Sequence, residues 1–395
     1  MIFPYFIPPS LAFIAAIVEK GMQPNVKRAV YRLVVLSAVV VYCCVYLNGS
    51  DWPNYEMFFE KITWYNWIKE SRDLGFELGF SLCMLLLKVI GFNFMIALII
   101  MKSFSLITIS HFFYKFSLSK YAYGDARNIF LLLFIFYITN GMYLYVETII
   151  RFSIALAIVI KSFKYLFIHK FILFLLLVLL ASLFHRTALV VVPLYFIRSI
   201  KLSSIWLFVL VAVVYIFFTP QMLLIVFKFI NGYGNNIFIA KLVAYLELTI
   251  RLRQINPLAI GNIVHFLFFI LILLFRKKLE HISKYGKQFF AATMIFFVVY
   301  FNYKWNNETC SNWSIRLFYN FFFIIALAEL FSMTSINRGV IFLITAIFWI
   351  CGMYLSIERN FCFKHYTNYI TATIEGKADL TLHEKFSIYR SWSVE

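Results

Sequence analysis

The sequence predicts an all-α polytopic membrane protein that forms a single integral membrane domain over residues 1–395. Apolar runs recur along almost the whole chain, and each is roughly long enough to cross the hydrocarbon core of a bilayer. The composition agrees, because 63% of the residues are hydrophobic and only 14% are charged, too little charge for a soluble domain of this size. Backbone groups in hydrocarbon must bond within their own segment, so the runs are expected to be helices. The runs cover residues 30–47, 93–114, 128–146, 149–168, 170–199, 203–229, 257–275, 288–303, 314–333 and 338–356.

The gaps between the runs carry clusters of Lys and Arg, which orient a membrane protein because basic loops stay in the cytoplasm. Alternating from these basic loops predicts about 11–13 helices with the N-terminus outside. Residues 76–91 are then expected to form a re-entrant segment, and residues 170–199 a tight hairpin. The basic loops are 19–29, 115–127, 161–170, 198–201 and 276–287, and the outer (periplasmic) segments are 48–75, 140–150, 231–256 and 304–313, of which 48–75 and 231–256 are the long loops.

Charge and cysteine content exclude several other classes of protein. The 36 Lys and Arg against 18 Asp and Glu give a net charge of +18, but the positive residues sit at helix ends, where orientation explains them and no nucleic-acid partner is required. The six cysteines form no CxxC pair and no metal-like spacing with His, so no metal and no cofactor is expected. Residues 1–18 lack a basic start, and we expect a first short membrane helix there rather than a cleavable signal peptide.

Two carboxylates near the outer interface are candidates for chemistry, because charged residues at membrane depth are costly and are functional candidates by default. Asp51 begins an outer loop directly after a membrane helix, and Glu77 opens the next apolar run. A carboxylate there could act as a general base on a hydroxyl or orient a sugar. The alternative for Asp51 is that it caps a short amphipathic helix, since Pro53 follows two residues later.

Basic residues on the outer face form a second candidate group, because orientation rules disfavour them there. Arg151 follows Glu147 at the i, i+4 spacing, which an intrahelical ion pair would explain equally well. His185 and Arg186 interrupt an apolar segment at the expected hairpin tip; the alternative for His185 is a structural, hydrogen-bonded role. A lipid pyrophosphate would account for the outer arginines, because the planar guanidinium binds phosphoryl oxygens bidentately. The complete set is Arg151, Arg186, Arg251, Arg253 and Arg316.

Several nucleotide and metal motifs are absent from the sequence. It contains no DxD, no GxxxxGK[ST], no GxGxxG and no HExxH. A donor activated by ATP or by a nucleotide is therefore disfavoured. The energy for any transfer would have to reside in a substrate that is already activated.

Five short motifs occur in an order that resembles the Wzy/EpsG family of O-antigen and exopolysaccharide polymerases. They are Gly49-Ser-Asp51 with Tyr55, Glu77-Leu-Gly-Phe80, Ile90-Gly-Phe-Asn-Phe94, Ile150-Arg-Phe-Ser-Ile-Ala155 and Ala181-Ser-Leu-Phe-His-Arg-Thr-Ala188. The similarity is clearest over residues 45–200, and the stretch Arg316-Leu-Phe-Tyr319 also looks similar.

The resemblance implies a glycosyltransferase of the bacterial inner membrane that works at the periplasmic face. Its substrates would be oligosaccharides linked to undecaprenyl pyrophosphate, its surroundings membrane lipids, and a chain-length regulator protein a candidate partner. In that case Asp51, Glu77 and His185 would be the catalytic residues, with His185 or Asp51 as the base and Glu77 as a positioning group. The five arginines would bind pyrophosphate, and Arg151 and Arg186 would contribute most.

Three other functions remain open from the sequence. A flippase for lipid-linked oligosaccharides would also need cations for pyrophosphate, although the outer bias of the arginines argues against it. A membrane O-acyltransferase needs a His at membrane depth, for which His265 is the best candidate, although it could equally be a buried structural residue. An O-antigen ligase is close in chemistry and is separated only by the resemblance.

Overall fold

The computed structural model describes most of the chain as two compact units. One comprises Met1–Val192 with Phe331–Glu395, and the other Pro193–Leu330. The described residues are 3–49, 51–118, 128–197, 200–217, 220–232, 243–244, 247, 260–281, 286–304, 310–333, 346–347, 350–355, 357–358, 363, 365–378 and 380–394.

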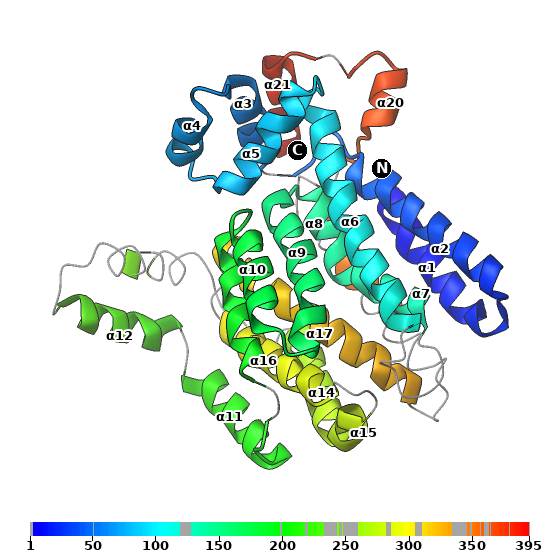
Figure 1. The fold of residues 1–395 in the computed structure, drawn as a ribbon, viewed down its shortest axis with the longest axis vertical. Coiled ribbons are helices and arrows are strands. Elements are labelled where there is room, and N and C mark those ends of the chain that lie inside the picture. The colour runs from blue at the N-terminus through cyan, green and yellow to red at the C-terminus, as the bar shows by residue number, and fades with distance from the viewer. Residues whose placement is uncertain are drawn as a thin grey trace. The chain divides into compact units, whose positions relative to one another are not determined.

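Within these ranges the secondary structure is helical, as the sequence predicts, and the β-structure consists of one isolated bridge between Val45 and Asn368. The first unit contains a bundle in which α10 packs on α9, α9 on α6, and α1 on α7 (Figure 1). Helix α9 is apolar on almost every side, and most of its side chains are buried accordingly. The bundle consists of α1 (Ile7–Val18), α2 (Pro24–Ala38), α6 (Phe94–Leu118), α7 (Ile129–Phe136), α8 (Met142–Val146), α9 (Ile150–Phe167) and α10 (Phe171–Ser182).

Two helical segments of the described residues, Phe94–Phe116 and Ile129–Val146, are long and apolar enough to cross a membrane by length and composition. Other apolar runs form shorter helices, among them Leu78–Val89 and Phe171–Ser182. At 1.5 Å per residue, a helix of this size covers roughly 18 Å of a core that is roughly 30 Å thick. The described part of the chain therefore supports a helical membrane protein, whereas the full set of about 11–13 spans stays a prediction.

The predicted outer loop 48–75 is itself helical. It contains α3 (Trp52–Lys61) and α4 (Trp67–Asp73), and α5 (Leu78–Val89) follows directly. Figure 1 shows these three helices together at one end of the first unit, beside the C-terminal helix α21 (Leu382–Val394). The membrane depth of α5, which the sequence predicts to be re-entrant, stays a prediction.

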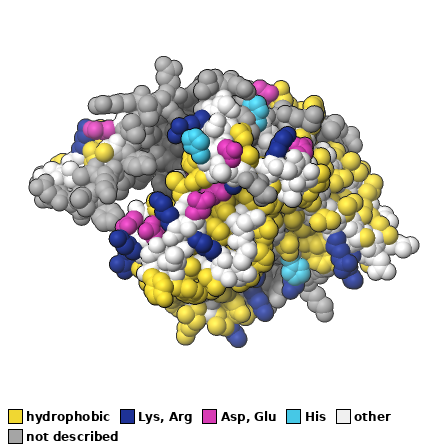
Figure 2. Space-filling model, turned by 90° about the horizontal axis from the view of Figure 1, so that it is seen from above, with side chains coloured by type: hydrophobic (Ala, Val, Ile, Leu, Met, Phe, Trp, Pro, Cys, Tyr) yellow, Lys and Arg dark blue, Asp and Glu magenta, His cyan; other side chains and the backbone are white. Residues whose placement is uncertain are grey.

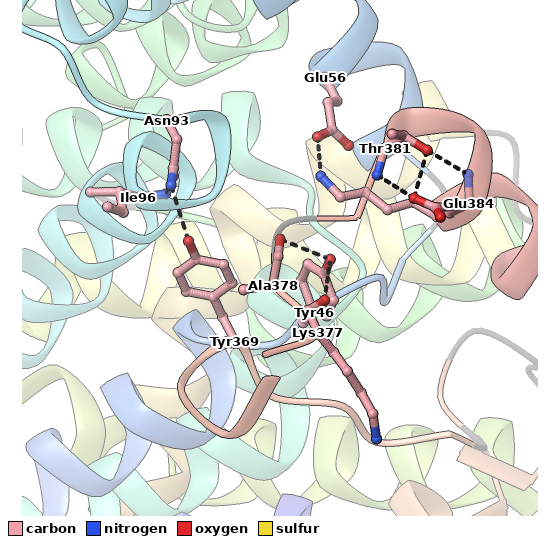
Figure 3. Close-up of polar contacts among 10 residues, drawn as sticks. Tyr46, Glu56, Asn93, Ile96, Tyr369, Lys377, Ala378, Thr381 and Glu384 are labelled. Atoms are coloured by element: carbon pink, nitrogen blue, oxygen red, sulfur yellow. Dashed lines mark hydrogen bonds and ion pairs between the residues drawn. The ribbon is translucent and has the colours of Figure 1, made fainter. Parts of the chain in front are cut away.

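The C-terminal tail returns to this end of the first unit. The Tyr46 N–H donates to the Thr367 carbonyl at 3.0 Å, and the Tyr369 N–H to the Cys44 carbonyl at 2.7 Å, just before α20 (Tyr369–Ile374). Farther along, the Tyr46 hydroxyl lies 3.4 Å from the Lys377 carbonyl, as Figure 3 shows. The mixed charges of the tail do not predict its side of the membrane, but these contacts place it beside the segment that leads to Asp51.

The second unit is held largely by aromatic packing. Phe296 stacks on Phe323 with ring centroids 4.7 Å apart, and His265 stacks on the same Phe323 ring at 5.7 Å. His265 is thus packed against an aromatic ring, an arrangement that suits its structural alternative. The unit contains α11 (Ser204–Phe217), α12 (Pro220–Gly232), α14 (Ile260–Leu274), α15 (Arg276–His281), α16 (Gly286–Lys304) and most of α17 (Cys310–Met333).

Candidate active site

A chain of hydrogen bonds at the α3 end of the first unit begins with Asp51. The Tyr55 hydroxyl, one helical turn later, donates to Asp51 Oδ2 at 3.1 Å. Arg151, from the first turn of α9, donates through Nε to the Tyr55 oxygen at 3.1 Å. Tyr55 is 1% exposed, so its hydroxyl has no bulk water to replace either partner.

Glu77 continues this chain and joins three segments. Arg151 Nη1 donates to Glu77 Oε2 at 2.8 Å, and His185 Nδ1 lies 3.4 Å from Glu77 Oε1. The backbone N–H of Arg186 also donates to Oε1, at 3.4 Å. Six residues from four of the motifs therefore meet in one network, which we call the outer network: Asp51, Tyr55, Glu77, Arg151, His185 and the Arg186 backbone.

Asp51 occupies the position before α3 that a helix cap would occupy, and Pro53 lies at the start of that helix. The capping alternative is therefore correct about the helix start. However, the carboxylate makes no capping hydrogen bond and instead accepts from Tyr55. Its side chain thus belongs to the outer network rather than to the helix terminus.

Arg151 does not share a helix with Glu147. Helix α8 ends at Val146 and α9 begins at Ile150, because Thr148 between them has a φ of 63°. The guanidinium instead pairs with Glu77 and lies 5.0 Å from the centroid of the Phe76 ring. The ion pair and this cation–π contact hold the guanidinium plane in a fixed orientation.

A close backbone approach brings the His185 turn to Glu77. The Gly79 N–H donates to the Leu183 carbonyl at 2.8 Å. A Cβ on Gly79 would lie 2.8 Å from both Leu183 Cβ and Leu183 O, so only glycine allows α5 to come this near to the turn after α10. The Glu77-Leu-Gly79 motif and the Leu183-Phe-His185 motif are therefore in direct contact with each other.

The electrostatics of the network keep Glu77 ionised. Burial raises the pKa of its carboxyl, but the hydrogen bond with His185 and the charges of Arg151 and His185 outweigh burial and lower the pKa to about 2. The His185 ring is additionally held edge-on to Phe152, at a centroid distance of 5.6 Å. A carboxylate on Nδ1 fixes the orientation of an imidazole and leaves Nε2 to exchange a proton.

The remaining predicted arginines differ in their positions. Arg186 is exposed, beside the network rather than within it. Arg316 lies in α17, but its side chain is outside the described residues, as are Arg251 and Arg253 altogether. Figure 2, a view onto the α3 end, shows acidic, basic and histidine side chains gathered on this face. The structure therefore brings together Asp51, Glu77, Arg151, His185 and Arg186, and leaves the other three arginines as predictions.

Sequence reasoning missed two residues that organise the site. Tyr55 appears in a motif, but only the structure makes it the link between Asp51 and Arg151. Lys102 lies within an apolar span and is 2% exposed; its Nζ donates to Thr148 Oγ1 at 3.3 Å, and Thr148 in turn donates to the Asn48 carbonyl at 3.0 Å. The signal for Lys102 was available, because a charged residue inside an apolar span is rare and usually functional.

One of three comparisons with known proteins finds a match. No curated protein and no solved structure matches the chain. The family model of the EpsG family does match, and its matched residues contain every member of the outer network. The chain therefore belongs to the EpsG family, with residues 28–370 matched and most of the sequence covered.

Proposed function

We propose that this protein is a bacterial polysaccharide polymerase that transfers a glycan from undecaprenyl pyrophosphate onto a lipid-linked repeat unit at the periplasmic face of the inner membrane. Membership of the EpsG family makes it a membrane protein of polysaccharide biosynthesis. The observation that supports the finer statement is the outer network, which combines a histidine on a carboxylate with two arginines.

The proposed base is His185. Its Nδ1 faces Glu77, so Nε2 would take the proton from the acceptor hydroxyl as this oxygen attacks the anomeric carbon of the donor. The bond from that carbon to the pyrophosphate oxygen breaks with its electron pair, and undecaprenyl pyrophosphate leaves. Glu77 would stabilise the imidazolium that forms, because its pKa is lowered to about 2 and the carboxylate is therefore ionised at neutral pH.

The proposed pyrophosphate ligands are Arg186 and Arg151. Arg186 contributes only its backbone N–H to Glu77, so its exposed guanidinium can contact an anionic lipid headgroup. Arg151 uses Nε and Nη1 within the network, and among the described residues Nη2 makes no hydrogen bond. Negative charge grows on the leaving pyrophosphate in the transition state, so fixed arginines lower the barrier most where water is scarce. Arg251, Arg253 and Arg316 are further candidates from the sequence.

The lipid anchors of the two substrates would also accelerate the transfer reaction. Two substrates held at the same membrane depth lose translational freedom before they react, which converts a bimolecular encounter into a nearly unimolecular one. The donor is already activated by its pyrophosphate bond, which agrees with a sequence that carries no nucleotide-binding motif.

The test is deletion of the gene in its host, followed by separation of the surface glycan on a gel. We expect the polymer ladder to disappear while a single capped repeat unit survives. Loss of all repeat units would indicate a flippase or ligase instead, and an intact ladder would indicate a decorating enzyme such as an acyltransferase.

Complementation then tests the arginines. Arg151→Ala and Arg186→Ala should each fail to restore the ladder at wild-type abundance in the membrane. Arg72→Ala is the matched control, because Arg72 is exposed on α4 at the same end of the first unit. Full ladders with both network variants would contradict the pyrophosphate assignment.

A further inference from the structure

The last helix of the chain is anchored beside the candidate active site by a buried ion pair. Lys385 Nζ lies 2.5 Å from Glu56 Oε1, and the two side chains are 9% and 4% exposed (Figure 3). The start of α21 is capped, because Glu384 Oε2 accepts from both the N–H and the hydroxyl of Thr381 at 2.7 Å. Such an anchor fixes both the position and the rotation of α21 on α3.

Aromatic packing extends this anchor to the first residue of α3. The Trp52 ring lies 5.9 Å from Phe386 and 5.6 Å from Tyr389, centroid to centroid. Trp52 directly follows Asp51, so α21 packs against the helix that carries the first member of the outer network. The Trp52 indole is 2% exposed, and its Nε1 has no hydrogen-bond partner among the described residues.

A cavity of about 440 Å³ opens on α21. It is lined by His383, Phe386, Ser387 and Arg390, which recur at the spacing that places residues on one face of a helix. Sites for small molecules commonly have volumes of roughly 300–1,000 Å³ and combine apolar walls with a few polar groups. The volume of the cavity falls within this range, Phe386 supplies an apolar surface, and the other three residues supply polar groups; we call this surface the α21 face.

We propose that the α21 face binds a carboxylate-bearing segment of the glycan and holds it beside the outer network. The Arg390 fork can receive a sugar carboxylate bidentately, and the Ser387 hydroxyl and His383 ring can bond ring hydroxyls. The Phe386 ring offers an apolar surface to the C–H face of a pyranose. This inference rests on the proposed function, because it assumes that the outer network acts on glycans.

Because the α21 face adjoins the outer network, it can take part in elongation of the polymer. Phe386 both lines the cavity and contacts Trp52, and Trp52 adjoins Asp51. A glycan held on α21 would therefore stay near the network after one transfer and before the next. Retention of this kind would lengthen the product without changing the chemical step.

The experiment is a binding measurement on the full chain in nanodiscs, with hexagalacturonate as the acidic probe and maltohexaose as the neutral one. We expect wild-type protein to bind hexagalacturonate, and Arg390→Gln and Phe386→Ala each to weaken this binding at least fivefold. Arg72→Gln, which removes the same charge from an exposed site on α4, should remain within twofold of wild type. Maltohexaose should bind more weakly than hexagalacturonate, and Arg390→Gln should reduce this difference.

Absence of hexagalacturonate binding to the wild type would overturn the proposal, as would binding to Arg390→Gln and Phe386→Ala at wild-type strength. Because Arg390 is exposed, its substitution should leave the thermal unfolding transition in place, and that transition is measured on each variant. The proposed function is tested separately by the gene deletion. If the ladder is lost on deletion but the binding test fails, the polymerase assignment stands and only the α21 face is wrong.

Discussion

Tyr55 is the residue on which the outer network depends most, since its hydroxyl is the only group that joins Asp51 to Arg151 among the described contacts. Tyr55→Phe keeps the ring packing on Phe76 and Phe80 but removes this link. Asp51 and Arg151 are partly buried, so losing the partner that they share costs roughly 1 kcal/mol or more. We therefore expect polymerisation to fall roughly tenfold or more, measured as the initial rate of polymer formation in membranes.

Tyr65→Phe is the matched control for this substitution. Tyr65 lies in the same outer segment, but its side chain is fully exposed. It should leave the rate unchanged. Equal rates for Tyr55→Phe and Tyr65→Phe would contradict the network as a functional unit.

Glu77 gives a pH-dependent prediction. Its pKa is lowered from 4.5 to about 2, so its contribution to stability is fully present above pH 4.5 and is lost as the pH falls toward 2. Removing the charge by Glu77→Gln should therefore lower the thermal unfolding temperature clearly at pH 7, where the contribution is on the order of 3 kcal/mol. At pH 3 the difference in thermal unfolding temperature between wild type and Glu77→Gln should be smaller than at pH 7. A gap that does not change with pH would show that the Glu77 charge does not stabilise the folded state.

At the scale of elements, the contact between α5 and the turn after α10 decides whether the site forms. Gly79→Ala places a Cβ 2.8 Å from the Leu183 backbone oxygen, so the two segments must separate. Overpacking of this kind typically costs about 1–3 kcal/mol. We expect a lower thermal unfolding temperature together with loss of polymerisation.

Gly21→Ala controls for the change from glycine to alanine. A Cβ at Gly21 would meet nothing within 4 Å, and Gly21 does not have a positive φ. This variant should keep wild-type stability and activity. If Gly79→Ala behaves in the same way, the close approach is not what positions His185.

The elements also indicate what the sequence could and could not predict. The apolar runs predicted the helices of the bundle, and the motifs singled out Asp51, Glu77, Arg151, His185 and Arg186, which the structure brings together. The length of each helix was less predictable, because breaks such as the positive φ of Thr148 arise from tertiary contacts, here with Asn48 and Lys102. Within the 48–75 loop, Pro53 signalled the start of α3 as an alternative, whereas the mixed aromatic and charged residues of α4 gave no helical signal.

At the scale of the whole molecule, the contacts of the C-terminal tail indicate its side of the membrane, which its mixed charges do not. Because the tail pairs with the segment around Tyr46 and with α3, we expect residues 365–378 and 380–394 to lie on the same side of the membrane as Asp51. Sequence patterns could not predict this, because contacts such as Val45 with Asn368 join segments more than three hundred residues apart.

The sidedness is testable by cysteine labelling in a variant whose six native cysteines are replaced by serine. Lys377→Cys, in the tail, should react with a membrane-impermeant maleimide in spheroplasts. Lys277→Cys, in the predicted cytoplasmic segment, should react only after permeabilisation; both lysines are exposed. If Lys377→Cys requires permeabilisation, the tail and the outer network are cytoplasmic, and a periplasmic polymerase is excluded.

We propose that this chain alone transfers glycan from lipid pyrophosphate through the outer network. It is tested most directly with purified protein in proteoliposomes that contain lipid-linked repeat units and EDTA but no nucleotide. We expect the wild type to form polymer and to release one undecaprenyl pyrophosphate per linkage formed, and we expect His185→Gln to form no polymer at equal protein concentration. Polymer from His185→Gln at the wild-type rate, or a wild-type protein that forms polymer only with a nucleotide sugar, would contradict it.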